Sequence, residues 1–396
     1  MPEGDATPVP LLRRAGRRVG ILTSVHPALD TRVFHKQARI LAAAGYHVTL
    51  IAQHDRDACA DGVRIRALPA ATPRWRRPLL WWRILLDALR LRADVYHIHD
   101  PELLPLALLL QRLTQRPVVY DVHEYYADEV RTRQWIPAPL GGPAAWLTGR
   151  MEQAAARRLG AVVTVNEHMN RRFLRVQPRS IAIYNYPPAE YFPPPLDGAR
   201  DQSIIYAGVM TRDRGLETIF RAGQLLKQRF PAMRIDVAGI VDWSGVATGI
   251  PRDTEVWSRE AGVHFLGLIP QPELPALLSR ATAGWIPFLP TPNNVRSTPN
   301  KLLEYMAAAL PVVASDFGYM RSIVSDAGCG RLATAGDPAS HAEKLGLLLE
   351  RPDEARAMGE RGRAAVLRRY TWAGEGEKLV RLYDELTGVS GSLGRA

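Results

Sequence analysis

Short apolar runs alternate with longer amphipathic stretches along most of this chain. The runs are rich in β-branched residues, and the stretches between them repeat apolar residues every three or four positions. This alternation is typical of parallel strands connected by crossover helices. The predicted strands are 18–24, 47–53, 63–69, 94–100, 117–124, 161–166, 180–185, 203–209, 233–240, 263–269, 283–289, 311–316 and 329–334. The pattern therefore predicts the α/β fold class, with two doubly wound parallel sheets.

A proline-rich segment, 186–202, interrupts this pattern, and we interpret it as a linker between two domains. A chain of 396 residues is also too long for one ordinary hydrophobic core. The predicted organisation is a disordered tail at 1–17, a Rossmann-like domain at 18–185, the linker, a second Rossmann-like domain at 203–370 and a crossover helix at 371–388. Two such domains predict a ligand cleft between them.

The composition is that of a soluble globular protein, with 46% hydrophobic and 23% charged residues. Two cysteines, Cys59 and Cys329, are too few for a disulfide framework and suit a reducing compartment. The N-terminal residues carry acids and prolines where a signal peptide has an apolar core. The longest apolar run, about eight residues at 103–110, is too short to span a bilayer. We therefore expect a cytoplasmic protein.

The net charge of +11 is concentrated in one part of the chain, because the arginines between residues 64 and 92 are opposed only by Asp87. This region includes an apolar stretch with Trp81 and Trp82. Arginine interleaved with Trp and Leu is typical of helices that lie on anionic membranes, so segment 74–92 is a candidate for peripheral membrane contact. The alternative is a surface helix with its apolar stripe in the core and its arginines in solvent. No motif for nucleic acid accompanies the charge, and we expect no such partner.

Polar residues gather where the predicted strands end, which is where ligands bind in sheets of this kind. In the first half these residues are His26, Asp30, Arg32, Asp100, His123, Glu124, Asn166, Glu167 and Asn185. In the second half they lie at 208–215, at Asp242, in a loop at 290–300 and at Asp316. His97 and His99 share one face of a strand. We expect them to pack or hydrogen-bond, and we expect no metal site, because the sequence places no third ligand near them.

The sequence AGVMTRDRGLET, 207–218, predicts a glycine at a strand end and a helix that opens at Arg214 and Gly215. Backbone amides at a helix start, together with a cation, are suited to a diphosphate. The segment is not the G-x-G-x-x-G fingerprint of nicotinamide and flavin enzymes. The alternative is that Arg214 is a solvated arginine at a helix start.

A second helix start is predicted in STPNKLLEYMAAA, 297–309. Ser297 or Thr298 would cap the helix and Pro299 would occupy its first turn. The amides of 298–301 would then face the cleft beside Lys301, and Glu304 would accept hydrogen bonds from a ribose. The alternative is a surface pair between Lys301 and Glu304. The apolar neighbours of Glu304 disfavour full exposure, so we favour a nucleotide site.

The motifs STPNKLLEYMAAALPVVASD, YAGVMTRDRGLETI, YDVHEYY and HPALDTRVFHKQARILAAAGYHVTLIA resemble those of the retaining GT-B glycosyltransferases of family 4. The resemblance covers about residues 18–388 in the right order. It implies a nucleotide-diphospho-sugar bound by the C-terminal domain and an acceptor bound by the N-terminal domain. It also implies transfer without a metal or other cofactor and with retention of anomeric configuration, the nucleotide-sugar serving as co-substrate.

The resemblance assigns roles residue by residue. Glu304 matches the second Glu of an E-x7-E motif, which holds the donor ribose, and Arg214 matches a cation that neutralises the diphosphate. His123 matches a histidine that closes on the reacting sugar, and Asp30 and Glu124 are expected to orient the acceptor or the sugar. The predicted donor-binding residues are Gly208, Arg214, Gly215, Leu268, Ile269, Arg296, Ser297, Thr298, Asn300, Lys301, Leu302 and Glu304, with Leu268 and Ile269 near the base.

Two positions depart from the family pattern. The first Glu of E-x7-E is Arg296 here, and Val209 stands where many members have a second phosphate-binding arginine. The first change leaves the donor sugar open, and one hypothesis is that Arg296 binds a carboxylate or a phosphate; the alternative is a loop arginine in solvent. The sequence thus predicts a glycosyltransferase acting on a glycan or lipid-linked acceptor in cell-envelope or exopolysaccharide assembly. A catalytically weak nucleotide-sugar-binding subunit and a nucleotide-sugar epimerase of the same fold are the alternatives.

Overall fold

The computed structural model describes residues 14, 16–69, 77–132, 137–188, 192, 200–270 and 273–389. It divides into two compact units. Unit 1 is formed by Met1–Asn185 and Ala373–Ala396, and unit 2 by Tyr186–Trp372. Most of the predicted tail 1–17 and of the predicted linker 186–202, and residues 74–76 of the arginine-rich segment, lie outside the described residues.

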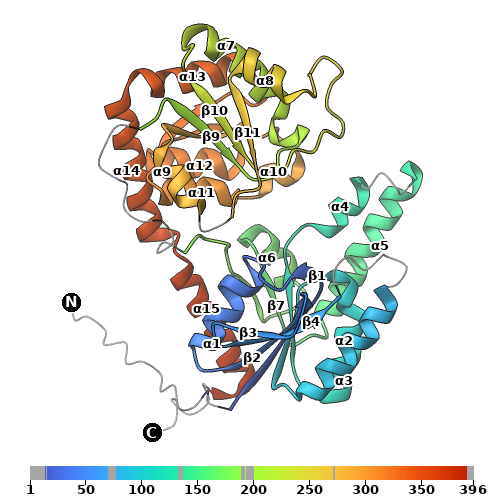
Figure 1. Ribbon diagram of the computed structural model, residues 1–396. Coiled ribbons are helices and arrows are strands. Elements are labelled where there is room, and N and C mark those ends of the chain that lie inside the picture. Colours follow the sequence, from blue (N-terminus) through green and yellow to red (C-terminus); the bar gives the residue numbers. More distant parts are fainter. Residues whose placement is uncertain are drawn as a thin grey trace, which may run out of the picture. The chain divides into compact units, whose positions relative to one another are not determined.

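Unit 1 contains an eight-stranded sheet (Figure 1). Its strands are β1 (Arg18–Pro27), β2 (His47–Gln53), β3 (Ala58–Ala60), β4 (Val63–Leu68), β5 (Val95–Ile98), β6 (Val118–Val122), β7 (Ala161–Thr164) and β8 (Ser180–Ala182). They lie in the order β3-β4-β2-β1-β5-β6-β7-β8, and all pairs are parallel except β3 with β4. The short edge strand β3 has no apolar run, so the sequence pattern did not predict it.

The helices of unit 1 lie on both faces of its sheet. They are α1 (Arg39–Ala43), α2 (Arg77–Leu91), α3 (Leu104–Thr114), α4 (Tyr126–Thr132), α5 (Ala138–Ala156), α6 (Glu167–Leu174) and α15 (Trp372–Thr387). Leu22, Tyr96 and Tyr120 pack in one core with α2 and α3. On the opposite face His97 meets Tyr383 of α15. Figure 1 shows α2 and α3 on one side of this sheet and α1 and α15 on the other.

The helix between β1 and β2 begins in a wider form than a regular α-helix. Val33–Ala38 is a π-helix, in which the amides of His35 and Gln37 bond to carbonyls five residues earlier, and only Arg39–Ala43 is α-helical. The helix ends before Gly45, which adopts a left-handed conformation (φ 97°) as expected of a glycine at a helix end. Single π-turns within helices are frequent at functional sites.

Unit 2 contains a six-stranded parallel sheet in the order β11-β10-β9-β12-β13-β14. Its strands are β9 (Ser203–Ala207), β10 (Arg234–Ala238), β11 (Val263–Gly267), β12 (Ala283–Ile286), β13 (Val312–Ser315) and β14 (Gly330–Ala333). Its helices are α7 (Leu216–Arg229), α8 (Thr254–Ala261), α9 (Leu274–Arg280), α10 (Pro292–Arg296), α11 (Asn300–Ala307), α12 (Gly318–Ala327), α13 (Pro338–Glu350) and α14 (Pro352–Arg369). One core that includes Trp257, Trp285 and Tyr305 fills the unit.

Both sheets are doubly wound, which confirms the predicted fold class. In unit 1 the order reverses at β1, which lies between β2 and β5, and in unit 2 it reverses at β9, between β10 and β12. Ligands bind beyond the carboxyl ends of strands at such reversals. The residues that follow β1, β5, β9 and β12 are therefore the first candidates for a ligand site.

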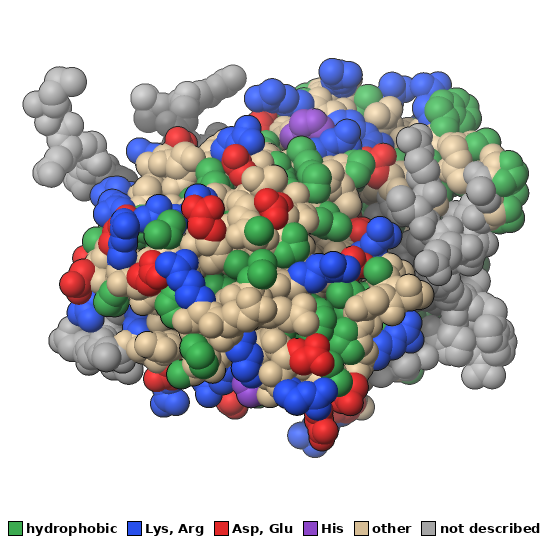
Figure 2. Space-filling view, turned by 90° about the horizontal axis from the view of Figure 1, so that it is seen from above, with side chains coloured by type: hydrophobic (Ala, Val, Ile, Leu, Met, Phe, Trp, Pro, Cys, Tyr) green, Lys and Arg blue, Asp and Glu red, His purple; other side chains and the backbone are tan. Residues whose placement is uncertain are grey.

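Three findings relate to the predictions made from composition and charge. Among the described residues no helix is both long and apolar enough to cross a bilayer. On the face shown in Figure 2 basic and acidic side chains are interspersed, so this face carries no broad field of one sign. Cys59 is exposed and Cys329 is buried, and both are free thiols.

Candidate functional site

The start of α11 differs from the prediction. Pro299 is the N-cap and makes no side-chain capping bond, and the helix begins at Asn300 (φ −62° and ψ 128° at Pro299). Ser297 and Thr298 therefore do not cap it, because these residues and Pro299 form the extended turn that joins α10 to α11. The amide of Leu302 bonds to the carbonyl of Pro299 (3.0 Å). The amides of Asn300 and Lys301 are the ones with no acceptor inside the helix.

Arg296 is the last residue of α10 and is half-buried, so the prediction of one continuous loop at 290–300 was wrong. Thr291 begins this short helix by accepting a hydrogen bond from the amide of Asn294 (3.3 Å), with Pro292 in its first turn. Thr and Pro at these positions are an ordinary helix-start signal, which sequence reasoning missed because the helix is only five residues long.

Glu304 lies one turn after Lys301 in α11 and is half-buried. Lys301 is buried, and its ammonium makes no hydrogen bond to any residue that the structure describes. The two residues are therefore not the exposed surface pair that was the alternative interpretation. Burial lowers the pKa of Lys301 well below its usual value; the nearby charge of Arg214 lowers it further, and that of Glu304 opposes both.

The segment after β9 is shaped by two glycines. Gly208 has φ 114° and Gly215 has φ 87°, both in the region that favours glycine. A Cβ at Gly215 would also overlap the carbonyl oxygen of Pro287, which follows β12. Gly215 is the N-cap of α7, as the predicted helix opening required. The close approach brings the segments after β9 and β12 together at the strand reversal.

Arg214 is held at this place by several contacts. Thr211 accepts a hydrogen bond from its amide (3.3 Å), and its guanidinium donates to the carbonyl of Val209 (2.9 Å). The guanidinium also lies over the ring of Phe288, 6.0 Å from the ring centre. Arg214 is therefore positioned by the fold rather than extended into solvent.

Leu268 and Ile269 follow the edge strand β11, where Leu268 is exposed.

The carboxyl end of the unit 1 sheet holds a group of histidines and carboxylates. Asp30 accepts hydrogen bonds from the amides of Arg32 (2.8 Å) and Val33 (2.9 Å), which begins the π-helix. His26 lies 3.4 Å from Asp30 and 3.7 Å from Asp100. Burial lowers the pKa of His26, but the hydrogen bond to Asp30 and the charge of Asp100 outweigh it, so the pKa is raised.

His123 is part of the same group. Its ring lies 5.0 Å from the ring of His26, and its Nε2 lies 3.0 Å from Nδ1 of His99 and 3.4 Å from Asp121. Glu124 is adjacent in sequence, but its side chain is exposed. The structure therefore brings Asp30 and His123 together through His26, and it leaves Glu124 at the surface of the unit.

Asp121 is the buried centre of this group, and sequence reasoning missed it. Both its oxygens accept from the guanidinium of Arg32 (2.9 Å each), and one also accepts from Gln37 (2.7 Å). Burial raises the pKa of Asp121, but the charge of Arg32 outweighs this and holds the pKa well below its usual value. A carboxylate inside the otherwise apolar run VVYDV was the available signal, since such a group is rarely buried without a partner.

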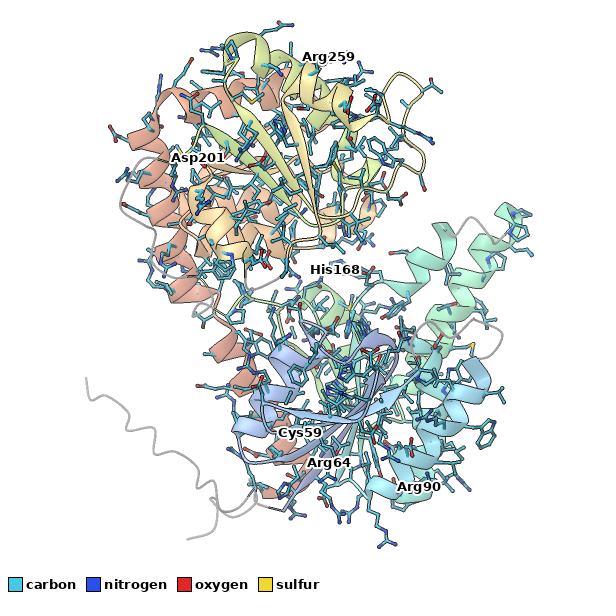
Figure 3. All side chains as sticks on the ribbon, viewed as in Figure 1. Cys59, Arg64, Arg90, His168, Asp201 and Arg259 are labelled. Atoms are coloured by element: carbon cyan, nitrogen blue, oxygen red, sulfur yellow. The ribbon has the colours of Figure 1, made fainter. Side chains whose placement is uncertain are left out.

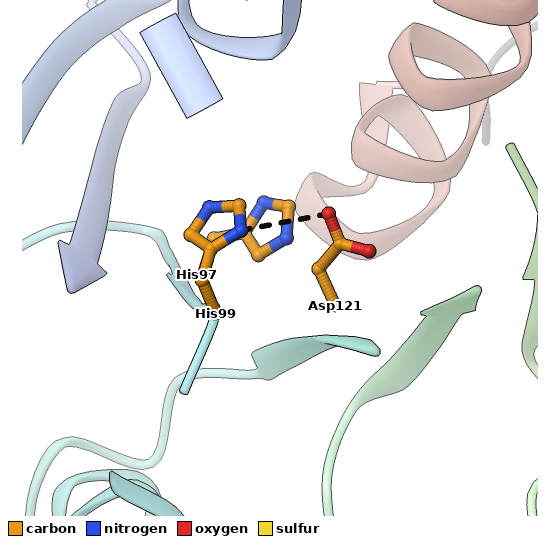
Figure 4. Close-up of side chains that lie close together, drawn as sticks. All are labelled: His97, His99 and Asp121. Atoms are coloured by element: carbon orange, nitrogen blue, oxygen red, sulfur yellow. Dashed lines mark ion pairs between the residues drawn. The ribbon is translucent and has the colours of Figure 1, made fainter. Parts of the chain in front are cut away.

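His97, His99 and Asp121 form a group of described residues whose ligand atoms lie close enough to hold a metal ion (Figure 4). Asp121 is thus the third neighbour that the sequence did not provide. His97 and His99 stack 4.5 Å apart, and Tyr383 of α15 contacts Nδ1 of His97 (2.7 Å). A cation here would compete with the Arg32 guanidinium for both oxygens of Asp121. All three residues also contact other described side chains, Asp121 through Arg32, His97 through Tyr383 and His99 through His123.

The opposite end of unit 1 has different chemistry. In Figure 3 His168 lies at one end of this unit, and Cys59, Arg64 and Arg90 lie at the other. A hollow of about 590 Å³ near the amino ends of β1, β2 and β4 is lined by these last three residues, among others. It lies away from the carboxyl ends of the strands, where the candidate site residues gather.

Two family models match the chain. Residues 31–185 match the model described as glycosyl transferase 4-like domain, and residues 201–351 match the model described as glycosyl transferases group 1. The first match lies in unit 1 and the second in unit 2.

Curated relatives agree. A D-inositol 3-phosphate glycosyltransferase of Corynebacterium urealyticum is 30% identical over 187 residues, which cover 46% of this chain and 43% of that protein. The match thus spans less than half of that relative's length. A phosphatidyl-myo-inositol mannosyltransferase of Mycobacterium leprae is 25% identical over 341 residues, covering 83% of this chain and 80% of that protein.

Solved structures show the same fold. The sucrose-phosphate synthase of Thermosynechococcus elongatus has a TM-score of 0.70 at 18% identity, covering 94% of this chain and 100% of that one. The Anabaena protein HepE, in complex with UDP, has a TM-score of 0.69 at 14% identity, covering 93% and 100%. The fold is GT-B, and the chain belongs to the family 4 glycosyltransferases, as its motifs predicted.

Proposed function

We propose that this protein transfers a hexosyl group from a nucleotide-diphospho-sugar to a glycan or lipid-linked acceptor, with retention of anomeric configuration and without a metal. Unit 2 would bind the donor and unit 1 the acceptor, in cell-envelope or exopolysaccharide assembly. The observation that carries the proposal is the set of groups at the strand reversal of unit 2. There Arg214, the start of α11 and Glu304 offer a cation, open amides and a carboxylate.

The donor part of the proposal rests on chemistry suited to a nucleoside diphosphate. Amides at a helix start and an arginine attract phosphate oxygens, and a half-buried carboxylate one turn further along accepts from ribose hydroxyls. The Anabaena protein HepE, which shares the fold, has been solved with UDP. The two chains are only 14% identical, so this likeness does not specify the base or the sugar of the donor that the present chain would use.

The reaction requires a leaving group whose negative charge grows as the anomeric bond breaks. Fixed donors aimed at that charge stabilise the transition state, and the loss of one such donor typically costs about 10²-fold in rate. Arg214 and the amides of Asn300 and Lys301 are our candidates for this role. We propose that the acceptor attacks from the face that the diphosphate leaves, and that the departing phosphate takes the acceptor's proton.

On the acceptor side, α2 supports a membrane-proximal substrate. Leu80, Ile84, Leu85 and Ala88 lie in the core, yet Leu79, Trp82 and Leu86 on the same helix are 71%, 62% and 50% exposed. The helix therefore has a second apolar stripe, flanked by Arg83 and Arg90. An exposed apolar stripe beside arginines is suited to the surface of an anionic membrane.

The test is turnover. Purified protein would be incubated with UDP-, GDP-, ADP- and TDP-sugars in EDTA, with and without membrane lipid extract, and products followed by mass spectrometry. We expect one nucleoside diphosphate to be released and the sugar to appear on a lipid or glycan. Glu304→Gln should lower the rate by about 10²-fold, whereas Glu343→Gln, at an exposed glutamate of α13, should leave it unchanged.

Other outcomes would favour the alternatives. An isomerised nucleotide-sugar without transfer would identify an epimerase. Binding of a nucleotide-sugar without turnover, with every donor and with lipid extract present, would identify a binding subunit. Activity abolished by EDTA and restored by a divalent cation would contradict the metal-independent mechanism.

A further inference from the structure

Lys301 is a buried cation without a polar partner. The residue is 7% exposed, and its ammonium makes no hydrogen bond to any of the described residues. The ammonium lies 3.5 Å from the ring centre of Tyr206 and 5.0 Å from that of Phe288. Aromatic faces attract a cation, but they do not replace the hydrogen bonds that an ammonium makes in water.

Such an arrangement costs stability. An ammonium taken from water without a carboxylate or a carbonyl oxygen to receive its protons is strongly disfavoured, and burial lowers its pKa accordingly. Nearby Arg214 adds to the cost, since the two cations repel each other. A residue that destabilises the fold in this way is usually retained for a function.

The position of the ammonium indicates what it would bind. Lys301 belongs to the first turn of α11, whose amides attract anions. A Cβ on Gly208, at the carboxyl end of β9, would lie 3.4 Å from the Lys301 ammonium. Arg214 contacts the same Phe288 ring. Two cations and a helix start therefore converge at one place, and Glu304 is an opposite charge close to them.

The neighbouring residue Val209 adds an independent observation. It follows Gly208 directly and is 42% exposed, at a position where a second arginine was expected from the family resemblance. Its carbonyl oxygen accepts from Tyr206 (2.8 Å) and from Arg214 (2.9 Å). The backbone at 209 is therefore fixed, but the valine side chain carries no cation, and the ammonium of Lys301 lies over the ring of the same Tyr206.

We propose that Lys301 is the second cation of the diphosphate site, uncompensated in the free protein and paired only when a nucleoside diphosphate binds at the start of α11. This rests on the proposed function and specifies how its donor site works. In the free protein the ammonium is covered, so contact with a phosphate oxygen requires a change of rotamer, which the flexible four-carbon stem of lysine permits. Arg214 and Lys301 together would then match the two charges of the diphosphate.

The first test is binding of inorganic pyrophosphate and of UDP, GDP, ADP and TDP, measured by calorimetry. We expect Lys301→Met to weaken pyrophosphate, and whichever nucleotide binds, by about 10- to 100-fold, as for the loss of a charged hydrogen bond. The corresponding nucleoside, which has no phosphate, should bind both proteins equally. Lys344→Met, at a lysine paired with Glu343 on α13, is the matched control and should bind as the unaltered protein does.

Thermal unfolding separates this role from a structural one. If Lys301 serves only binding, Lys301→Met should unfold at a higher temperature than the unaltered protein without ligand, yet lose the upward shift that pyrophosphate causes. A lysine that stabilised the fold would give a lower unfolding temperature. The double variant Val209→Arg with Lys301→Met should recover pyrophosphate binding, because an arginine at exposed position 209 returns a cation to the site.

The outcomes are distinguishable. If the unaltered protein binds neither pyrophosphate nor any of the four nucleotides, the proposed function fails and this inference fails with it. If it binds them and Lys301→Met binds them equally well, the inference about Lys301 is wrong and the proposed function stands.

Discussion

His341 is buried in unit 2, where the indole N–H of Trp285 donates to its Nδ1 (3.0 Å). The indole is only a donor, so this contact requires an unprotonated Nδ1. Burial lowers the pKa of His341 to about 4. The unfolded chain, with a pKa near 6.5, therefore binds the proton more readily than the folded one. Stability from this group is complete above about pH 6.5 and is lost as pH falls towards 4, by roughly 3 kcal/mol.

The lowered pKa of His341 predicts a specific effect of substitution. His341→Asn removes the titrating group and keeps an acceptor for Trp285, so the free energy of unfolding should fall less between pH 7 and pH 4.5 than in the unaltered protein. Urea unfolding followed by circular dichroism at both values measures the difference. His264→Asn, at an exposed histidine of β11, should keep the full pH dependence. An undiminished pH dependence in His341→Asn would contradict the assignment.

Single residues of the candidate site were predictable where the chain keeps them close in sequence. Lys301 and Glu304 share one helix, and Arg214 and Gly215 are adjacent, so local spacing placed them. The partners of Asp121 were not predictable, because Arg32 is 89 residues away and reaches it through the order of the strands. Spacing along a chain carries no information about contacts of that kind.

At the scale of elements, the close packing of α14 depends on Gly359. A Cβ there would overlap the carbonyl oxygen of Ala309, just after α11, and would approach Pro311. Gly359→Ala should therefore destabilise unit 2 by about 1–3 kcal/mol through overpacking, although alanine favours helices. Gly142→Ala is the matched control, since a Cβ on this helical glycine of α5 meets nothing within 4 Å. It should stabilise the protein by about 0.5–1 kcal/mol in urea unfolding, and equal effects of the two changes would contradict this account.

The exposed stripe of α2 gives a second prediction at this scale. If it contacts membranes, the unaltered protein should sediment with anionic vesicles, and less so at high salt. The double variant Trp82→Ser with Leu86→Ser should bind at least about tenfold more weakly, because each buried side chain contributes roughly 1.5–3 kcal/mol. Leu225→Ser with Leu367→Ser, at exposed leucines of unit 2, should sediment as before. Equal binding by both double variants would contradict the assignment.

The period of apolar residues predicted most helices and strands, because a helix or a strand that buries one face must repeat its apolar positions. Short elements could not be predicted from this period. Strand β3 and helix α10 are three and five residues long, too short to display a period. The π-helix at 33–38 escaped for another reason, since its apolar residues fit an α-helical period equally well and the widening follows from hydrogen bonds at Asp30.

The last helix, predicted as a crossover helix at 371–388, packs on unit 1, and the apolar period alone could not have shown on which sheet it packs. The amphipathic pattern shows that α15 has an apolar face, but it does not identify the surface on which that face packs. In the structure Asp384 of α15 accepts hydrogen bonds from Arg14 (2.7 Å) and from Tyr46 (2.7 Å), and Glu375 accepts from the amide of Tyr184 (2.9 Å). These contacts tie residues from the two ends of the chain into unit 1.

That arrangement has a consequence for how the protein is made. A ribosome delivers the eight strands of unit 1 first, then all of unit 2, and only then the helix that contacts His97 and Tyr46. At a synthesis rate of about 5–20 residues per second, α15 is completed on the order of 10 s after the strands of unit 1. During that interval the part of the sheet that α15 covers, including His97, stays exposed although α1 already lies on the same face (Figure 1). A fragment that ends at residue 185 would lack α15, and unit 1 would therefore be incomplete in it.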